Sequence, residues 1–263
     1  MDKAAAAADW LFKAHTEARR FEPLPEALTP RTPDEAYAIQ DDFVALRAHQ
    51  LGAIAGYKIA LSTRAMQKFV GVDRPQAGVV FESRVLRSPA RVRRADFLNL
   101  VVEFEIAVEV AEDLAAADAP FSRERVARAV GAVMPAFEIA DDRNADYAQL
   151  KKRPLELIAD NCWNEGVVLG AAAKNWKKAD LAKVRGVASV NGKKVGEGVG
   201  ADALGHPFDA VAWVCNHLAS LGRGLLRGEF VITGSIVTSK FPNAGDALRF
   251  ELEGLGAVEL RVD

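Results

Sequence analysis

The 263-residue sequence predicts an α+β protein in which a helical segment, residues 1–53, precedes a mostly β body, residues 54–263. The first segment carries helix start and stop signals. Beyond residue 54 the apolar residues fall into short runs of the length that is typical of strands. No low-complexity linker separates the two parts, so we expect them to form one integrated domain.

The helical prediction for the first segment rests on a well-marked helix start. Thr32 is a preferred N-cap residue, Pro33 suits the first helical position, and Glu35 stands where a capping box places an acid. Apolar residues then recur at helical spacing as far as Gly52, which provides a stop signal. The Ala-rich start of the chain is interrupted by charges and is read as a helix, not as a signal peptide. We therefore expect the first fifty residues to be helical.

The body contains a series of apolar runs that we interpret as strands. These runs are 54–61, 78–82, 100–111, 132–140, 165–170, 187–191, 229–236, 247–252 and 256–262. Asn191-Gly192 is a strong hairpin signal. Interleaved helices are expected at 63–70, 122–130 and 207–221.

Composition excludes several classes of function. Lys and Arg number 34 and Asp and Glu number 36, so a net charge of −2 gives no electrostatic reason to expect binding to nucleic acid. No apolar run approaches the roughly 20 residues of a membrane span. The two cysteines, Cys162 and Cys215, suggest neither a disulfide framework nor a zinc motif. We expect a cytoplasmic protein.

Residues 101–110 are predicted to form a strand with one acidic face. Phe104 and Ile106 fall on one face, and Glu103 and Glu105 on the other, because side chains alternate along a strand. Neighbouring carboxylates on one face lie about 7 Å apart, where two charges repel by roughly 2–3 kcal/mol at an effective dielectric constant near 20. A solvated acidic face is ordinary in antiparallel sheets. This strand alone leaves a solvated face and a sheltered cation site both open.

A third carboxylate favours the sheltered interpretation. Glu138 lies within the apolar run 134–140, and a buried carboxylate needs a partner. Three carboxylates without histidine or cysteine are typical of a site for a hard cation, with water or substrate oxygens completing the coordination shell. We therefore predict that Glu103, Glu105 and Glu138 bind Mg²⁺ or Mn²⁺.

Two further features have both an ordinary and a functional interpretation. Lys58 is the one charge in the apolar run 54–61, where it is either a lysine that extends to solvent at a strand edge or a group held beside the metal. Thr233-Gly234-Ser235 either offers hydroxyl and N–H groups to an anion or forms an ordinary turn.

An ordered set of motifs runs from about residue 34 to the end of the chain. It comprises Gly56-Tyr57-Lys58-Ile59, Glu103-Phe104-Glu105, Pro135-Ala136-Phe137-Glu138, Ala159-Asp160-Asn161, Gly205-His206-Pro207, Ile232-Thr233-Gly234 and Asn243-Ala244-Gly245-Asp246. In this order and spacing the chain resembles the 2-oxopent-4-enoate hydratases, 2-oxohept-3-enedioate hydratases and 4-oxalocrotonate decarboxylases of the fumarylacetoacetate hydrolase superfamily. The resemblance implies a mixed β-sandwich or β-roll body and a homo-oligomer.

The same resemblance implies roles for particular residues. Glu103, Glu105 and Glu138 match the metal ligands of the family, and Lys58 matches its catalytic lysine. Four residues are the expected substrate-binding groups: Thr233, Ser235, Asp160 and Gln76. The hydrolase branch typically has an aspartate as third ligand and a catalytic histidine, so Glu138 favours the hydratase and decarboxylase branch.

We therefore expect a lyase of aromatic-compound catabolism that adds water to a 2-hydroxy-2,4-dienoate. A decarboxylase of a 2-oxo-3-hexenedioate is the alternative, because both reactions use the same electron sink. Gln76 departs from the family, which often has an acid there. This departure keeps open a second alternative, a non-catalytic partner that stabilises such an enzyme in a complex.

Overall fold

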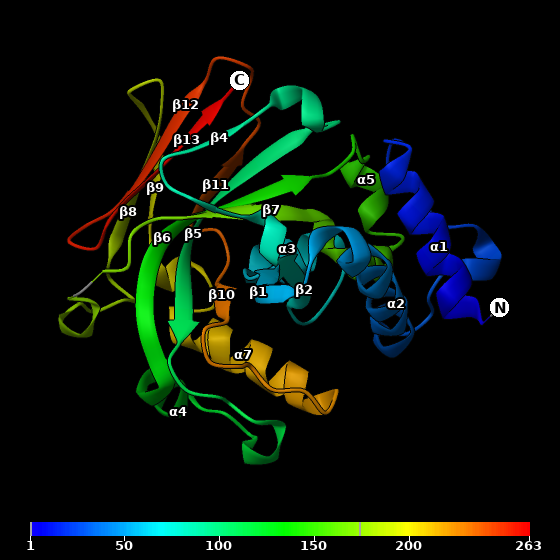
Figure 1. Cartoon of the computed structure of the whole chain (residues 1–263), viewed down its shortest axis with the longest axis horizontal. Helices are drawn as coiled ribbons and strands as arrows, with labels where there is room; N and C mark the ends of the chain where they lie inside the picture. Colours follow the sequence, from blue (N-terminus) through cyan, green and yellow to red (C-terminus); the bar gives the residue numbers. More distant parts are fainter. Residues whose placement is uncertain (1, 174) are drawn as a thin grey trace.

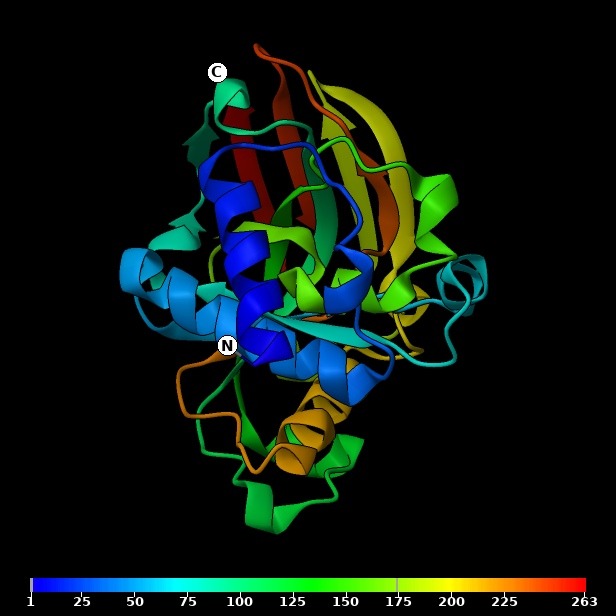
Figure 2. The same ribbon diagram turned by 90° about the vertical axis from the view of Figure 1, so that its right-hand side faces the viewer.

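Two helices form most of the N-terminal part in the computed structural model, which describes residues 2–173 and 175–263. α1 spans Lys3–Thr16 and α2 spans Pro33–Leu51. The predicted start of α2 is confirmed, because the Thr32 hydroxyl accepts a hydrogen bond from the backbone N–H of Glu35. Figure 2 shows α1 and α2 packed together along one side of the body.

The expectation that the first fifty residues are helical is wrong for the stretch between these two helices. There the chain is helical only in a short 3-10 turn, Glu26–Leu28. Pro23, Pro25 and Pro30 explain the interruption, because a proline removes a helical hydrogen bond and its ring clashes with the preceding turn.

The body contains a larger and a smaller β-sheet. The larger has the order β2-β1-β10-β5-β6-β7-β3, with β11 also paired to β5. Its strands are β1 (Ile54–Ala60), β2 (Gln76–Phe81), β3 (Val85–Arg87), β5 (Leu100–Val110), β6 (Val130–Asp141), β7 (Asn164–Leu169), β10 (Phe230–Ile232) and β11 (Val237–Lys240). The smaller sheet has the order β4-β13-β12-β8-β9. Its strands are β4 (Ala90–Val92), β8 (Arg185–Val190), β9 (Lys193–Val199), β12 (Ala247–Leu252) and β13 (Gly256–Val262).

Five helices are interleaved with these strands in the described part of the body. They are α3 (Arg64–Val70), α4 (Arg123–Ala129), α5 (Tyr147–Leu150), α6 (Pro154–Ala159) and α7 (Pro207–Ser220). The three predicted helices correspond to α3, α4 and α7. Sequence analysis missed α5 and α6, because helices of four and six residues are too short to show a helical period.

The strand predictions are confirmed in their main elements and wrong in detail. The Asn191-Gly192 hairpin joins β8 to β9, with both residues at positive φ. β9 was missed because it lies at the edge of its sheet and is mostly polar. The predicted run 229–236 is too long, since β10 ends at Ile232 and the next strand, β11, begins only at Val237.

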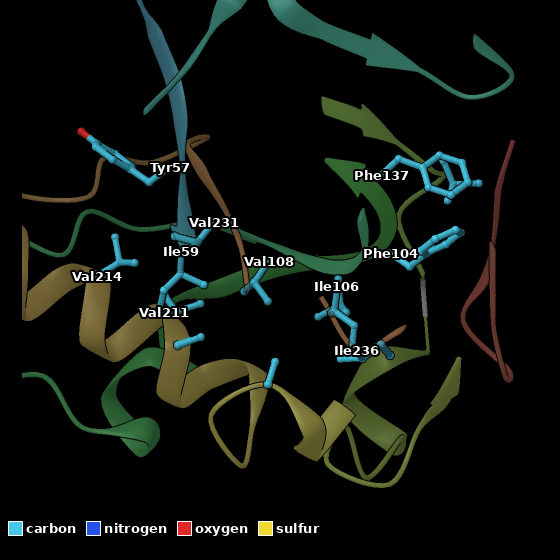
Figure 3. Packing of buried hydrophobic residues seen from close by; sticks show 14 of the residues in the cluster. Tyr57, Ile59, Phe104, Ile106, Val108, Phe137, Val211, Val214, Val231 and Ile236 are labelled. Carbon is cyan, nitrogen blue, oxygen red and sulfur yellow. The ribbon is translucent and has the colours of Figure 1, made fainter. Parts of the chain in front are cut away.

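The main hydrophobic core lies on the face of the larger sheet that carries Phe104 and Ile106, as the alternation in β5 predicted. The smaller sheet covers one part of this face, where Phe250 of β12 packs edge-on against Phe104 with ring centroids 5.6 Å apart. α7 covers another part, and Figure 3 shows its Val211 and Val214 facing the strands. Figures 1 and 2 place the smaller sheet and α7 at opposite ends of the molecule.

The other face of the larger sheet is enclosed. β2 and β7 contact each other although four strands lie between them in the sheet order, so the sheet curls around this face. A small apolar cluster fills the interior, including Val80 of β2, Met134 of β6 and Val167 of β7. The acidic face of β5 therefore points into the interior of the curled sheet, not into bulk water.

The structure confirms the α+β class. α2 packs against α6 and against β2 through a cluster that includes Tyr37, Ala77 and Ile158. The division at residue 53 and the single-domain organisation stay predictions. Within the described residues, no helix combines the length and the hydrophobicity that crossing a membrane requires.

Candidate metal and substrate site

Three carboxylates meet inside the curled sheet, and we call Glu103, Glu105 and Glu138 the carboxylate cluster. β5 and β6 pair antiparallel with Glu103 directly opposite Glu138, and Glu105 follows two residues along on the same face. One oxygen from each carboxyl group lies within 4.8 Å of the others. Glu105 and Glu138 are fully buried, and Glu103 is partly buried. The solvated acidic face that the sequence left open is therefore not what this strand presents.

Each carboxylate of the cluster is positioned by one neutral hydrogen-bond donor. Asn164 Nδ2 donates to Glu138 Oε1 at 3.0 Å, and the Ser239 hydroxyl donates to Glu103 Oε1 at 3.2 Å. The backbone N–H of Gly234 donates to Glu105 Oε2 at 2.6 Å. Two oxygens, Glu105 Oε1 and Glu138 Oε2, are buried without a hydrogen-bond partner among the residues that the structure describes. Such groups are costly in an interior, and both are oxygens of the kind that a hard cation binds.

Electrostatics lead to the same conclusion. Burial, followed by repulsion from Glu138, raises the pKa of Glu105 well above its ordinary value. The same two causes raise the pKa of Glu103. Both shifts mean that the ionised cluster lacks positive charge. An all-oxygen donor set with unpartnered oxygens fits a hard divalent cation.

Lys58 is the cation nearest to the cluster. It lies on β1 with its Nζ 3.1 Å from Glu138 Oε1 and is only 4% exposed, so it does not reach solvent at a strand edge. Gly78 lies opposite Lys58 on β2, and a Cβ there would approach Cγ of Lys58 to 3.2 Å. Burial by itself lowers the pKa of Lys58, but attraction to Glu138, with smaller contributions from Glu103 and Glu105, outweighs burial and raises it.

The break between β10 and β11 has a direct role in this geometry. Gly234 adopts φ of +101°, which L-residues rarely reach, and a Cβ at this position would lie 2.3 Å from the Ser62 hydroxyl. The turn aims the N–H of Gly234 at Glu105, after which the chain rejoins β5 as β11. Sequence analysis included this segment in the strand run 229–236 and left an ordinary turn at Thr233-Gly234-Ser235 open, and the structure has a turn there.

A cavity of about 400 Å³, which we call the site cavity, opens beside the cluster. Lys58, Glu103 and Glu138 line it, together with Ser235 and Ser239 from the β10–β11 region. Six mostly apolar residues that pack against one another form a second side of the cavity, which we call the apolar wall. The apolar wall consists of Val101, Ala140, Leu150, Leu157, Cys162 and Trp163.

The four predicted substrate-binding residues have different surroundings. Ser235 lines the cavity, and its hydroxyl accepts from the N–H of Phe104 at 3.0 Å and donates to the carbonyl of Val237 at 2.7 Å. Thr233 is buried, and its hydroxyl donates to the Ile106 carbonyl at 2.9 Å.

Gln76 and Asp160 lie away from the residues that line the site cavity. Gln76 Nε2 donates to the Pro154 carbonyl, and its side chain lines a different cavity between α2, α6 and α7. Asp160 is fully buried in contact with Arg143 and His15. Direct substrate contact by Thr233, Gln76 and Asp160 stays a prediction.

Asp160 belongs to a second group of buried charges, which we call the N-terminal ion cluster: His15, Arg47, Arg143, Asp160 and Glu165. His15 Nε2 lies 2.7 Å from Asp160 Oδ1, and Arg143 contacts the other oxygen of Asp160. Arg47 donates to both oxygens of Glu165, at 2.6 and 2.8 Å. Although burial opposes these charges, the pKa values of Asp160 and Glu165 are lowered and that of His15 is raised.

Sequence analysis missed two residues of the site and the role of His15. Asn164 and Ser239 are single polar residues whose contacts depend on which strands become neighbours, and no local pattern marks them. No local pattern marks His15 either, because its partner Asp160 lies 145 residues away in the chain.

Comparison with known proteins gives one consistent result. A family described as "Fumarylacetoacetate (FAA) hydrolase C-terminal" matches residues 43–263. The 2-hydroxyhexa-2,4-dienoate hydratase of Comamonas testosteroni is 30% identical over 95% of this chain and 94% of its own length. The 2-keto-4-pentenoate hydratase of Paraburkholderia xenovorans is also 30% identical, over 96% of this chain and 92% of its own.

A solved structure is similar over nearly the whole fold. The 4-oxalocrotonate decarboxylase of Pseudomonas putida G7, complexed with magnesium and adipate, superimposes with a TM-score of 0.90. It is 26% identical, and the match covers 99% of this chain and 97% of that one.

Proposed function

This chain belongs to the fumarylacetoacetate hydrolase family, and from that premise we propose that it is a divalent-metal-dependent lyase that adds water to a 2-hydroxy-2,4-dienoate. The family resemblance seen in the sequence is confirmed. The observation that carries the proposal is the carboxylate cluster with its two unpartnered buried oxygens, beside a buried lysine and a cavity. The hydratases among the relatives support the reaction class.

We propose that Glu103, Glu105 and Glu138 hold Mg²⁺ or Mn²⁺. Support comes from the all-oxygen donor set and from the 4.8 Å limit on the separation of its atoms. When bound, such a cation supplies Lewis acidity that favours the enolate form of a 2-oxo acid. Asn164, Ser239 and the Gly234 N–H orient the three carboxyl groups, and such supporting contacts fix ligand geometry.

The chain's own residues then account for substrate binding and proton movement. Lys58 Nζ is the proposed proton carrier, because it is the buried ammonium group at the cavity surface. The substrate changes from a 2-hydroxy-2,4-dienoate to its 2-oxo-3-enoate tautomer as a proton moves from the 2-hydroxyl to C5. Water then adds its oxygen at C4 and a proton at C3, which gives a 4-hydroxy-2-oxo acid. The apolar wall limits the entry of other water molecules.

Decarboxylation is the second candidate function, and the similarity to the 4-oxalocrotonate decarboxylase structure favours it. Both reactions need the same electron sink, so the carboxylate cluster serves either. Gln76 does not separate them, because its side chain lies outside the lining of the site cavity. We also propose a homo-oligomer, in contact with a partner enzyme of its pathway, and a reducing cytoplasm that suits the two free cysteines.

An ultraviolet assay tests the proposal. The purified protein is mixed with a panel of 2-hydroxy-2,4-dienoates and their dicarboxylate analogues, with Mg²⁺ or with a chelator. Loss of dienoate absorbance with formation of a 4-hydroxy-2-oxo acid, dependent on Mg²⁺ and absent in Glu138→Gln, supports the hydratase. Release of carbon dioxide from a dicarboxylate identifies the decarboxylase. No turnover of any compound with Mg²⁺ present contradicts both.

A further inference from the structure

The lining of the site cavity differs sharply between the end near the carboxylate cluster and the apolar wall. Val101 lies two residues before Glu103 on the same face of β5, and Ala140 lies two residues after Glu138 on β6. Residues with this spacing are about 7 Å apart along a strand. A substrate whose oxygens are held at the cluster therefore extends its carbon chain directly onto the apolar wall.

The apolar wall carries no charge that would receive a second carboxylate. Leu150, Leu157 and Trp163 pack with Val101 and Ala140 in one cluster, and each is less than 10% exposed. The indole Nε1 of Trp163 is buried without a partner, but as a neutral donor it does not balance a negative charge.

Among the described residues that line the cavity, Lys58 is the sole cation, and it is paired with Glu138. The remaining charged group of the lining, apart from the cluster, is the carboxylate of Asp202. A second substrate carboxylate would thus find no free cation among these lining residues, but only hydroxyl groups, the Asp202 carboxylate and apolar surface. Burial without a counter-charge is strongly unfavourable for an ionised group.

The mouth of the cavity continues the apolar surface. Met66 of α3 and Tyr147 of α5 both line the cavity, and they are 42% and 36% exposed. Neither Arg64 of α3 nor Lys151, which follows α5, lines the cavity. Arg64 contacts Gln67 and the Asp73 carbonyl, and Lys151 lies over the Phe69 ring at 4.9 Å.

We propose that the substrate of this chain has an uncharged tail, so that it is a 2-hydroxy-2,4-dienoate ending in hydrogen or an alkyl group and not its dicarboxylate analogue. This inference rests on the proposed function, since it assumes that the 2-oxo acid end lies at the carboxylate cluster. The apolar wall and Met66 are its specificity-determining surface.

A matched pair of substrates tests the inference in the parent protein with Mg²⁺. The two dienoates have the same chain length, and one ends in methyl while the other ends in carboxylate. We expect kcat/KM to favour the methyl compound by about 100-fold or more. Equal or better turnover of the dicarboxylate overturns the inference and leaves the proposed lyase function standing.

A binding measurement decides the inference even if neither dienoate is turned over, which would count against the proposed function alone. The saturated 2-oxo acids of the same length, one ending in methyl and one in carboxylate, are titrated into the protein by calorimetry with Mg²⁺. Tighter binding of the monoacid supports the uncharged tail. Tighter or equal binding of the diacid, or binding of neither, overturns it.

Two substitutions in α3 test whether the substrate tail contacts the surface formed by the apolar wall and Met66. Met66→Arg places a cation at the cavity, and it should shift the kcat/KM ratio about tenfold toward the dicarboxylate, with a parallel shift in the calorimetric affinities. Phe69→Arg is the matched control, because Phe69 is 40% exposed on the same helix but does not line the cavity. An equal shift in both variants, or none in Met66→Arg, contradicts the assignment of the tail to this surface.

Discussion

The carboxylate cluster and the N-terminal ion cluster are both groups of buried charges, but they differ in how completely their charges are paired. In the N-terminal ion cluster all four carboxylate oxygens of Asp160 and Glu165 contact a cationic side chain. In the carboxylate cluster three carboxyl groups lie beside one ammonium group, and two oxygens have no hydrogen-bond partner in the described part of the chain. The pKa values move accordingly, downward for Asp160 and upward for Glu105.

We interpret this difference as that between a group that stabilises the fold and one that would hold the proposed metal. A complete buried ion pair has no unpaired charge that could bind a ligand. Removing one partner leaves the other charge buried and uncompensated. An incomplete cluster is unfavourable in the free protein and persists where the bound ion restores the balance. Substitutions in the carboxylate cluster should therefore lower turnover without lowering stability. Substitutions in the N-terminal ion cluster should lower stability without lowering metal affinity.

The largest effect is expected from the carboxylate cluster. Glu105→Gln should lower turnover by about 1000-fold, equivalent to about 4 kcal/mol, because the proposed metal would lose a ligand. The metal-free variant should be at least as stable as the parent, since an uncompensated negative charge is removed. Turnover is measured with Mg²⁺, and the stability of the metal-free protein is measured by denaturant melts with a chelator. Glu109→Gln, on the same face of β5 but outside the cluster, should leave both unchanged.

The N-terminal ion cluster should show the reverse pattern. Asp160→Asn leaves Arg143 buried without its counter-charge and should lower the free energy of unfolding by about 3 kcal/mol. Metal affinity should stay that of the parent. Asp41→Asn is the control, because the exposed Asp41–Arg223 pair should contribute less than about 1 kcal/mol. A loss of metal affinity in Asp160→Asn without a loss of stability would place Asp160 in the site after all.

Lys58 tests whether the cation of the carboxylate cluster serves chemistry or the fold. Lys58→Met keeps much of the stem and should lower turnover by about 100-fold, as loss of a general acid–base group does. With Mg²⁺ present, its melting temperature and metal affinity should stay close to those of the parent. Normal turnover would show that Lys58 has only a structural role.

The smallest effect is a pH dependence in the N-terminal ion cluster. Despite burial, Asp160 and Glu165 raise the pKa of His15 above its unfolded value of about 6.5. The stability from protonated His15 is thus fully present below about pH 6.5 and is lost as pH rises through the folded-state pKa. The stability difference between the parent and His15→Gln should shrink from pH 6 toward pH 9 in denaturant melts. A difference that grows with pH would contradict the assigned protonation.

The carboxylate cluster could be predicted from sequence because its signals are local. Alternation along residues 101–110 separates Glu103 and Glu105 from Phe104, and a carboxylate within an apolar run marks Glu138. Lys58 stands out for the same reason. The family resemblance then related these residues to one another, because it depends on the order of several motifs along the chain and not on any single run.

The N-terminal ion cluster could not be predicted, because its members come from five separate places: α1, α2, the segment after β6, the end of α6 and β7. The motif containing Asp160 suggested a site residue, and nothing near it indicated His15. The sequence left a turn at Thr233-Gly234-Ser235 open but could not decide for it. Only the separate pairing of β10 and of β11 with β5 shows that the strand stops before Gly234.

Calorimetric titration with Mn²⁺ is the most direct test of the claim that the carboxylate cluster is a metal site. The parent and the three variants Glu103→Gln, Glu105→Gln and Glu138→Gln are titrated under identical conditions, with Asp160→Asn as the comparison from the other cluster. We predict binding by the parent and by Asp160→Asn, and a loss of affinity of at least about 100-fold in each of the three variants. Unchanged affinity in all three would contradict the metal site and, with it, the proposed function.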